Sequence, residues 1–396
     1  MTNSALTDQI SILVVDAKYP PDHTGSGLRI HRTYSRIRKQ FPVKIYVLTL
    51  QNQENSKDFE IYEGVEIYRI KPSRSVVAQF ISVGKFFLNN RKLSIDIVHA
   101  VGASILVITA SICAKLLSKK LIREKTVTLD ENSIGVTAKI KRFLNYPRYY
   151  HWLKYSYRCA DLLIAINSVI KDYYIKLGIN EKIIWNRPNP VDINIFKPSE
   201  NNKRNILREN LGLPNNKIVC LTIGKFEPRK NQNFLVEIAK KLNEKYIFIL
   251  AGPVSNQYKG YYAELQDSIH KNDLNQRFYI YSGHHKDIVK FIQASNILLV
   301  PSTSEGTPNV MLEALCCGLP VVVNENLHLQ EYIMNGVNGY NALLNPDNFV
   351  QSIEMAEDLS LEYTNSNYIA HTARKSYGSN MLDKEHLKHL ISLNHY

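Results

Sequence analysis

Residues 297–323 read ILLVPSTSEGTPNVMLEALCCGLPVVV, and the expected fold class follows from this segment. It starts with an apolar run, Ile297–Val300, passes through a polar turn, and ends with a second apolar run, Val321–Val323. Between the two runs, Val310–Cys317 has the length and apolar spacing of a helix. A strand, a helix and another strand in this order predict a parallel β-α-β unit, because parallel strands need a crossover connection.

The same alternation extends along the whole chain, whose 396 residues exceed the size of one ordinary hydrophobic core. The Asn- and Pro-rich segment 186–205 separates two series of β-α-β units, so we predict an α/β protein of two domains, 1–195 and 196–375. The predicted strands are 12–15, 43–49, 65–70, 96–99, 126–129 and 162–166 in the first half, and 218–223, 246–250, 278–281, 297–300 and 321–323 in the second.

Charge is distributed unevenly between the two halves. Residues 1–195 contain 29 Lys and Arg against 16 Asp and Glu, whereas residues 196–396 contain 20 of each. The first half should therefore attract an anionic partner, such as membrane headgroups, an acidic or phosphate-bearing acceptor, or nucleic acid. No zinc, RNP-like or helix-turn-helix signature accompanies the basic residues, so we do not expect nucleic acid.

Cysteine usage and hydropathy indicate a reducing cytoplasm. The five cysteines are scattered and lack Cys-x-x-Cys spacing, which predicts neither a disulfide framework nor a metal site. The N-terminus has no positive charge before its first apolar run, and we interpret that run as a strand. The longest uncharged apolar run, 101–114, is shorter than the about 20 residues that a spanning helix needs, so a buried helix is expected.

The turn within the opening segment is a candidate anion-binding site. Gly306 lies between a strand and a helix start, where free backbone N–H groups and the helix dipole favour phosphate. Glu305 and Glu313 lie eight positions apart, about two helical turns, and could both present carboxylates to sugar hydroxyls. The alternative is a capped helix start with two solvated acids.

A second candidate loop, Gly224–Asn231, follows the predicted strand 218–223 and reads GKFEPRKN. Its Lys225, Arg229 and Lys230 could neutralise a diphosphate without a metal ion. A solvated basic turn is the alternative for this loop.

Together the two loops resemble, in order and spacing, those of the retaining GT-B glycosyltransferases of family four, the group-one glycosyl transferases. The resemblance rests on Glu305, Glu313-Ala314, Gly318–Val321 and the segment Asn189–Asp192, in which Pro190 replaces the usual Gly. It extends to Phe196-Lys197-Pro198, Ala251-Gly252-Pro253, Ser282-Gly283, and Glu331 with Gly336–Gly339. It is strong over residues 186–345 and weaker before them.

The resemblance implies a GT-B fold of two facing Rossmann-like domains with parallel sheets and a cleft between them. Residues 1–195 would bind the acceptor, residues 196–375 the nucleotide-sugar donor, and a helix at about 376–396 would pack back on the first domain. Lys225 stands where the family usually has Arg, so the charge is kept but the bidentate fork is lost. Implied catalytic residues are Lys230, Glu305, Lys225 and His99. Implied donor-binding residues are Gly25, Gly27, Lys225, Arg229, Lys230, Gly252, Ser282, Gly283, Glu305, Gly306, Thr307, Pro308, Asn309, Val310 and Glu313.

The first half of the sequence contains fewer matches to the family's motifs, so its candidate acceptor-side residues are less specific. Gly25 and Gly27 resemble the family's glycine loop, although an ordinary flexible turn is the alternative. His99 ends the segment Asp96–His99, which resembles the family's Asp-x-x-His-x-His, with Val101 in place of the second His. It could orient the sugar or acceptor, or be a structural histidine. Asp130 and Glu131 are further acceptor-side candidates.

Residues 138–158 contain six Lys and Arg, seven aromatic residues and no acid. This composition fits a membrane headgroup interface, a glycan-stacking surface, or a helix whose aromatic side chains pack inward. Pro147 interrupts any single long helix.

We therefore expect a metal-independent, retaining glycosyltransferase of the hexosyltransferase type, with an NDP-sugar as co-substrate and no cofactor. The acceptor hydroxyl would belong to a glycan, a lipid-linked molecule or another anionic compound, in cell-surface polysaccharide or glycolipid synthesis. The protein would be cytoplasmic and peripheral on the inner face of the membrane. Alternatives are an NDP-sugar epimerase of GT-B fold and a catalytically weak sugar-nucleotide-binding scaffold subunit.

Overall fold

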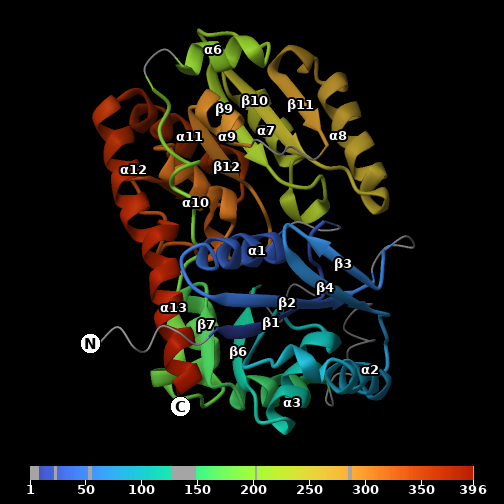
Figure 1. Ribbon diagram of the computed structural model, residues 1–396. Coiled ribbons are helices and arrows are strands. Elements are labelled where there is room, and N and C mark those ends of the chain that lie inside the picture. The colour runs from blue at the N-terminus through green and yellow to red at the C-terminus, as the bar shows by residue number, and fades with distance from the viewer. Residues whose placement is uncertain are drawn as a thin grey trace. The chain divides into compact units, whose positions relative to one another are not determined.

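A computed structural model describes residues 9–21, 25–51, 56–126, 149–200, 203–283 and 288–395 (Figure 1). The chain divides into two units, one formed by Met1–Pro188 with Met381–Tyr396 and the other by Asn189–Asn380. Within the described ranges, no helix is both long and apolar enough to span a lipid bilayer.

The division lies inside the predicted linker 186–205, but not at the predicted boundaries after residues 195 and 375. The reason is a backbone pairing around Val191. Its N–H donates to the Tyr377 carbonyl at 2.8 Å, and its own carbonyl accepts from the Ser379 N–H at 2.8 Å. Phe196 is also buried in the core of the second unit. These contacts assign both connecting segments to the second unit.

The first unit contains an eight-stranded sheet in the order β3-β4-β2-β1-β5-β6-β7-β8, parallel except for the β3–β4 pair. Its strands are β1 (Ile10–Asp16), β2 (Val43–Leu50), β3 (Phe59–Tyr62), β4 (Val65–Ile70), β5 (Ile97–Val101), β6 (Lys120–Lys125), β7 (Leu162–Ala165) and β8 (Ile184–Asn186). The strands β1, β5 and β7 are buried along their whole length, as expected for a sheet covered on both faces.

Helices cover the two faces of this sheet separately. One face packs against α2 (Val76–Asn89), α3 (Ile105–Leu116) and α5 (Ser168–Lys176), together with a helical segment at residues 149–158. The other face packs against α1 (Ser26–Ile37) and against α13 (Ser379–His395), whose Leu387 and Leu390 are buried there.

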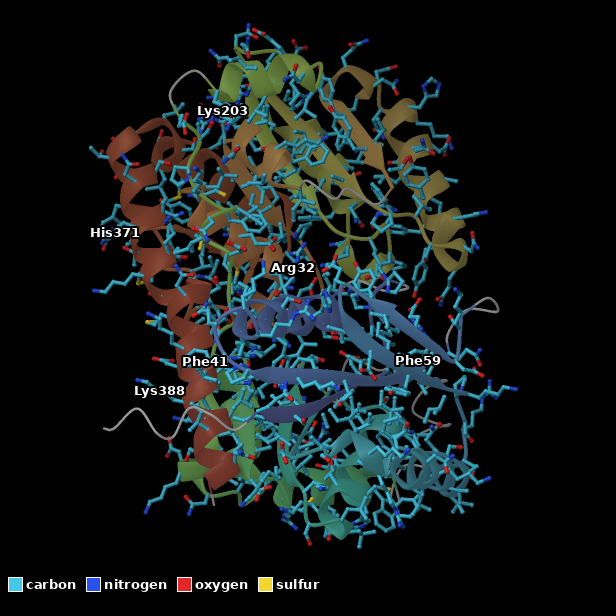
Figure 2. The ribbon with its side chains drawn as sticks, in the orientation of Figure 1. Arg32, Phe41, Phe59, Lys203, His371 and Lys388 are labelled. Atoms are coloured by element: carbon cyan, nitrogen blue, oxygen red, sulfur yellow. The ribbon has the colours of Figure 1, made fainter. Side chains whose placement is uncertain are left out.

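The second unit has a six-stranded, fully parallel sheet in the order β11-β10-β9-β12-β13-β14. Its strands are β9 (Ile218–Ile223), β10 (Tyr246–Gly252), β11 (Phe278–Ser282), β12 (Ile297–Val300), β13 (Val321–Asn324) and β14 (Gly339–Ala342). Around it lie α6 (Lys203–Asn210), α7 (Phe234–Lys241), α8 (Lys259–Lys271), α9 (Val289–Ala294), α10 (Asn309–Cys316), α11 (Pro346–Leu361) and α12 (Tyr363–Tyr377). In Figure 2, Lys203 marks the start of α6 and His371 lies on α12.

One strand of the first unit does not lie where the sequence predicts it. Strand β6 occupies Lys120–Lys125, before the predicted strand 126–129, of which residues 127–129 lie outside the described ranges. The sequence KLIREK looks polar, yet Arg123 and Glu124 are completely buried in the sheet. Buried charges of this kind need partners, and those partners come from distant parts of the chain.

Candidate functional site

In the second unit, two loops meet where β9 and β12 end. The Asn231 side chain donates to the Pro301 carbonyl at 3.2 Å. The Thr303 N–H donates to the Arg229 carbonyl at 2.8 Å. Because both strands are parallel, both loops leave the same edge of the sheet, which is where ligands bind in α/β proteins. The structure thus brings together the two loops that the sequence singled out.

A buried ion pair lies at the centre of these loops. Lys230 Nζ donates to Glu305 Oε1 at 2.5 Å, and Arg229 Nη1 lies 3.2 Å from Glu305 Oε2. The side chains of Lys230 and Glu305 are only 14% and 10% exposed, whereas that of Arg229 is 47% exposed. Arg229 also contacts Glu227 at 2.6 Å. The alternative of a solvated turn therefore does not describe Lys230 or Glu305.

The protonation state of Glu305 follows from this arrangement. Burial raises the pKa of its carboxyl, but the charges of Lys230 and Arg229 and the Lys230 hydrogen bond outweigh burial, so the pKa lies below its ordinary value. Glu305 is consequently ionised at neutral pH and accepts hydrogen bonds only.

Two glycines allow the strand ends at this site to approach closely. A Cβ on Gly252 would lie 2.0 Å from the Gly224 carbonyl oxygen, and one on Gly224 would lie 3.0 Å from Lys230 Cε. Gly224 N–H donates to the Ala251 carbonyl at 2.9 Å, which holds the two strand ends in this position. The Lys230 side chain thus lies against the backbone of Gly224, where no side chain stands in its way.

We predict that Gly252→Ala destabilises the second unit by about 2–4 kcal/mol, because the added methyl group overlaps a backbone oxygen that cannot move independently of β9. Thermal unfolding of the purified variant would measure this. Gly260→Ala is the matched control, since nothing lies within 4 Å of its added Cβ. Equal stability of the two variants would contradict the close approach.

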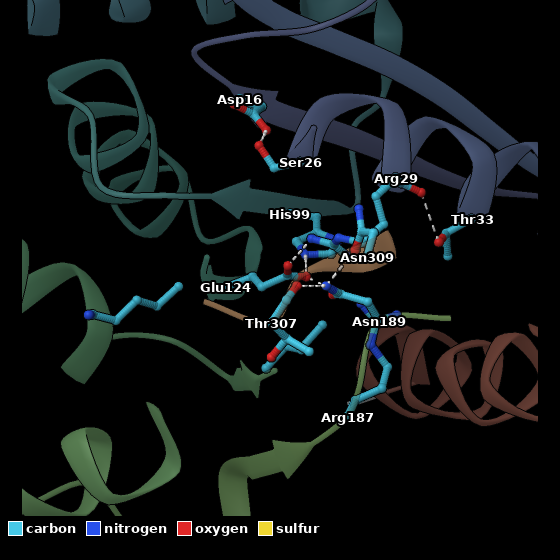
Figure 3. A network of polar contacts seen from close by, with 12 residues as sticks. Asp16, Ser26, Arg29, Thr33, His99, Glu124, Arg187, Asn189, Thr307 and Asn309 are labelled. Atoms are coloured by element: carbon cyan, nitrogen blue, oxygen red, sulfur yellow. Dashed lines mark hydrogen bonds and ion pairs between the residues drawn. The ribbon is translucent and has the colours of Figure 1, made fainter. Parts of the chain in front are cut away.

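The start of α10 is held by Asn189, the first residue of the second unit. Pro308 occupies the N-cap position, and no side chain caps the helix with a hydrogen bond. The Asn309 side chain accepts instead from Asn189 Nδ2 at 2.8 Å, and the same nitrogen lies 3.2 Å from the Thr307 carbonyl (Figure 3). The Asn189 amide thereby fixes the turn that precedes α10. This contact was not predicted from the sequence.

The remaining donor-side candidates lie around these loops. Gly306 and Thr307 are buried, and Thr307 hydrogen-bonds to Tyr332. Glu313, on α10, is only 8% exposed, which excludes the alternative of a solvated acid. Val310 lies in the first turn of α10 and is partly buried.

Lys225, Ser282 and Gly283 lie at neighbouring strand ends. Lys225 is partly buried, and within the described ranges its ammonium forms no ion pair. Ser282 ends β11 and is exposed, and the Gly283 N–H donates to the Gly252 carbonyl at 2.9 Å. The neighbouring His285 lies outside the described residues.

In the first unit, the predicted glycine loop is set by packing against β1. Gly25 has φ +93° and precedes α1, and a Cβ on Gly27 would lie 2.2 Å from the Lys18 carbonyl oxygen. Asp16, at the end of β1, accepts from the Ser26 hydroxyl at 2.9 Å and from the Lys18 N–H at 3.1 Å (Figure 3). These contacts hold Ser26 and Gly27 against the end of β1, whereas residues 22–24 of the predicted loop lie outside the described ranges.

Glu124 lies at the centre of a buried polar network in this unit (Figure 3). Arg29 of α1 donates to its Oε1, Arg187 Nη2 lies 3.3 Å from its Oε2, and His99 Nε2 lies 3.6 Å from the same oxygen. Burial raises the pKa of Glu124, but Arg29, His99 and Arg187 together lower it to about 2.

His99 belongs to this network and is completely buried. Its Nδ1 hydrogen-bonds the Tyr34 hydroxyl at 2.8 Å, and Arg187 Nη1 donates to Nδ1 of His386, on α13, at 3.1 Å. The geometry favours the structural interpretation of His99 that the sequence left open. The same contacts attach α13 to the first unit, as does the Arg36–Asp383 ion pair at 2.5 Å.

Comparisons with known proteins agree with this geometry. Residues 203–375 match the family model described as glycosyl transferases group 1. This part of the chain is thus similar to the glycosyl transferases group 1 family. The chain's two parallel-sheet Rossmann-like units are those of the GT-B fold, as predicted.

Two curated relatives are similar over part of the chain. The UDP-Gal:alpha-D-GlcNAc-diphosphoundecaprenol alpha-1,3-galactosyltransferase of Escherichia coli is 28% identical over 53% of this chain and 54% of that protein. The N,N'-diacetylbacillosaminyl-diphospho-undecaprenol alpha-1,3-N-acetylgalactosaminyltransferase of Campylobacter jejuni is 28% identical over 52% of this chain and 52% of that protein. The chain thus covers about half the length of each of these two relatives.

A solved structure is similar over nearly the whole chain. Alr3699/HepE of Anabaena, in complex with UDP, has a TM-score of 0.75 at 17% identity, and the match covers 97% of this chain and all of that one. At this level of identity, the likeness establishes the fold.

Several features of the protein were not predicted from its sequence. The partners Arg29, Glu124, Arg187 and His386 were missed, because the network joins four separate elements. The one available signal was the Arg-Glu pair inside an apolar strand-like run at Leu121–Glu124. Asp130 and Glu131 lie outside the described residues.

The basic aromatic segment 138–158 is described only from residue 149 onward, where it is helical. Trp152 and Tyr155 are 45% and 50% exposed, whereas Tyr157 is buried with the Arg123 guanidinium 4.6 Å from its ring centre. The described part therefore combines inward-packed and solvent-facing aromatic side chains.

Acid should destabilise the first unit. Burial lowers the pKa of His99, and it lowers that of His386 further. On unfolding, both bind protons below about pH 6.5, so stability falls between about pH 7 and 5 by up to about 1.4 kcal/mol per pH unit for each histidine. Asp16 has the opposite effect between about pH 4 and 6. Burial raises its pKa to about 6, so the folded protein binds this proton before the unfolded protein does, which offsets the effect of one histidine.

The tryptophans offer a direct measurement, since Trp152 and Trp185 are the only two and both lie in the first unit. The variant His386→Asn removes a titrating group and keeps a hydrogen-bond acceptor for Arg187. We expect the free energy of unfolding in urea to depend less steeply on pH in this variant, by the equivalent of about one proton. Exposed His371→Asn, in the second unit, is the control. A wild-type slope in His386→Asn would refute this assignment.

Proposed function

We propose that the protein is a retaining glycosyltransferase that moves a sugar from an NDP-sugar to an acceptor hydroxyl without a metal ion. The observation that carries the proposal is the buried Lys230–Glu305 pair beside the start of α10, at the edge where β9 and β12 end. It places a cation for phosphate, a carboxylate for sugar hydroxyls and helix N–H groups in one region of one unit.

In the proposed reaction, the bond from the anomeric carbon to the donor diphosphate breaks and a bond to the acceptor oxygen forms, with retention of configuration. The diphosphate leaves with the electron pair of the broken bond and takes up the proton that the acceptor hydroxyl releases. Lys230, Arg229 and Lys225 supply positive charge for it, and the uncapped start of α10 supplies N–H donors. Because these groups are fixed before the reaction, they stabilise the departing charge without reorganisation.

Glu305 has two proposed roles. In the structure it neutralises Lys230 and Arg229, which keeps both cations in place. With the donor bound, its ionised carboxylate would accept hydrogen bonds from the sugar hydroxyls, while the cations turn to the phosphates. Glu313 would act near the ribose and Ser282 near the base.

For the acceptor, we propose a lipid-linked or other anionic molecule used in cell-surface polysaccharide or glycolipid synthesis. Both curated relatives bear names that specify diphosphoundecaprenol-linked substrates. The excess of positive charge in residues 1–195 suits such an anionic acceptor. We place the protein in the cytoplasm, peripheral on the inner face of the membrane.

The proposal is tested by ligand-induced thermal stabilisation, with UDP, GDP, ADP and their sugar conjugates as ligands. A ligand that binds only the folded protein at about 100 times its Kd stabilises it by about 2.7 kcal/mol. We expect one nucleoside diphosphate and its sugar form to raise the transition temperature, equally with and without EDTA. The selected donor should then transfer its sugar to a diphosphate-linked prenol acceptor, and the anomeric proton coupling of the product reports its configuration. Absence of stabilisation by all the nucleotides would overturn the proposal.

A further inference from the structure

Helix α2 of the first unit carries an outward stripe of large apolar side chains. Val77, Ile81 and Leu88 are 69%, 52% and 56% exposed. Their separations of four and seven residues place them along one face of the helix. Single exposed apolar residues are ordinary on protein surfaces, but three along one stripe form a patch that calls for an explanation.

The opposite face of α2 is apolar as well. Val83, Phe86 and Phe87 are buried in the core of the first unit, together with residues of α3. A helix at a water-exposed surface normally pairs one apolar face with a polar one. Since the inward face already accounts for the packing of α2, the outward stripe has no role in this core.

Cations are interleaved with the stripe. Residues 71–95 contain no Asp or Glu and five basic residues, Lys71, Arg74, Lys85, Arg91 and Lys92. Lys85 is exposed and lies between Ile81 and Leu88 in the sequence, on the same face. This segment thus combines apolar side chains with uncompensated positive charge.

The neighbouring helix α3 also ends in exposed apolar side chains. Leu116 and Leu117, at the end of α3, are 70% and 46% exposed. Helices α2 and α3 pack against each other on the same face of the sheet (Figure 1). We call Val77, Ile81, Lys85, Leu88, Leu116 and Leu117 the α2–α3 surface.

The edge strand β3 also presents apolar side chains beside α2. Phe59, labelled in Figure 2, is 47% exposed and its ring lies 5.1 Å from that of Tyr68. The Tyr68 ring lies in turn 5.4 Å from Phe86 of α2. Ile61, two residues along β3 from Phe59 and 66% exposed, lies on the same side of the strand.

We propose that the α2–α3 surface binds a lipid bilayer that contains anionic headgroups. Apolar side chains enter the boundary between headgroups and acyl chains, while Lys85 and the flanking cations contact phosphates. Lysine is depleted in the centres of protein–protein interfaces, which favours a membrane over a protein partner here. The proposal extends the proposed function by naming the membrane-contacting surface, and it rests on that function only for the lipid-linked acceptor.

Flotation with vesicles tests this surface in the full-length protein. Vesicles of phosphatidylcholine and phosphatidylglycerol, in a molar ratio of about three to one, should carry the protein to the top of a density gradient, and phosphatidylcholine alone should not. We expect Ile81→Glu and Lys85→Glu each to lower the partition coefficient roughly tenfold, the first through lost apolar burial and the second through charge reversal. High salt should weaken binding of the wild-type protein.

Ile206→Glu is the matched control, because Ile206 is 55% exposed in the short basic helix α6 of the second unit. It should float like the wild-type protein. Failure of the wild-type protein to float, or equal flotation of Ile81→Glu and Ile206→Glu, would overturn the proposal. So would self-association that Ile81→Glu abolishes while flotation is absent. Nucleotide-induced stabilisation should be the same in all these variants, so its loss in the wild-type protein would count against the proposed function alone.

Discussion

Replacing Lys230 with Met should lower sugar transfer about a thousandfold and abolish stabilisation by a nucleoside diphosphate. Methionine keeps the unbranched side chain that lies against Gly224, where a Cβ would be 3.0 Å from Lys230 Cε, but it removes the charge. Arg229, which also contacts Glu305, keeps its charge, but its side chain is 47% exposed and therefore more strongly screened by water and salt. Steady-state kinetics with the selected donor and thermal shifts with the free diphosphate measure the two effects.

A loss of fold must be separated from this loss of function. Lys230→Met leaves Glu305 with one ion-pair partner, so we expect a stability loss of about 1–3 kcal/mol without ligand. Lys240→Met is the control, since Lys240 is 44% exposed and pairs with Glu237 on the surface of α7. An undiminished nucleotide shift in folded Lys230→Met would refute the assigned donor site.

Replacing Glu305 with Gln should separate recognition of the sugar from recognition of the diphosphate. The neutral amide loses charge-assisted hydrogen bonds to the sugar hydroxyls, each worth about 1.5–3 kcal/mol, so kcat/KM should fall about a hundredfold. Binding of the free nucleoside diphosphate should be unchanged or tighter, because Lys230 and Arg229 lose a competing anion. Isothermal titration with both ligands gives the comparison.

A purely structural role of Glu305 predicts a different result. If Glu305 served only to hold the two loops together, Glu305→Gln would weaken binding of the sugar nucleotide and of the free diphosphate equally. Glu237→Gln, at a 51% exposed position, controls for a general change in charge. Equal losses for the two ligands would therefore remove Glu305 from sugar recognition.

Much of the second unit could be predicted from its sequence, because its signals are local. Strands β9 and β12 lie at the predicted 218–223 and 297–300, and each has a loop with the expected charged residues at its end. In a parallel sheet, the end of a strand fixes the edge on which its loop lies. Knowing the order of strand, loop and helix was thus enough to bring Lys230 and Glu305 together.

The first unit was harder to predict, because its decisive contacts are between distant residues. Strand β6 buries Arg123 and Glu124 within the polar sequence KLIREK, and two partners of Glu124 lie on α1 and next to the end of β8. Sequence periodicity reports which side chains are apolar, and it carries no information on which buried charges meet. His99 illustrates this, since the pattern around it left a ligand-orienting and a structural role open, and only the contacts favour the structural one.

The contacts of Asn189 and Val191 also bear on where a recombinant fragment of the second unit should begin and end. A fragment cut at the matched residues 203–375 would lack the donor to the Thr307 carbonyl and the Asn309 side chain, and the pairing of Val191 with Ser379. It would also expose apolar surface that Phe196 and Tyr377 cover. Fragments used for crystallisation or for directed evolution of donor choice should therefore run from Asn189 to Asn380, so that the loop they are meant to vary keeps its scaffold.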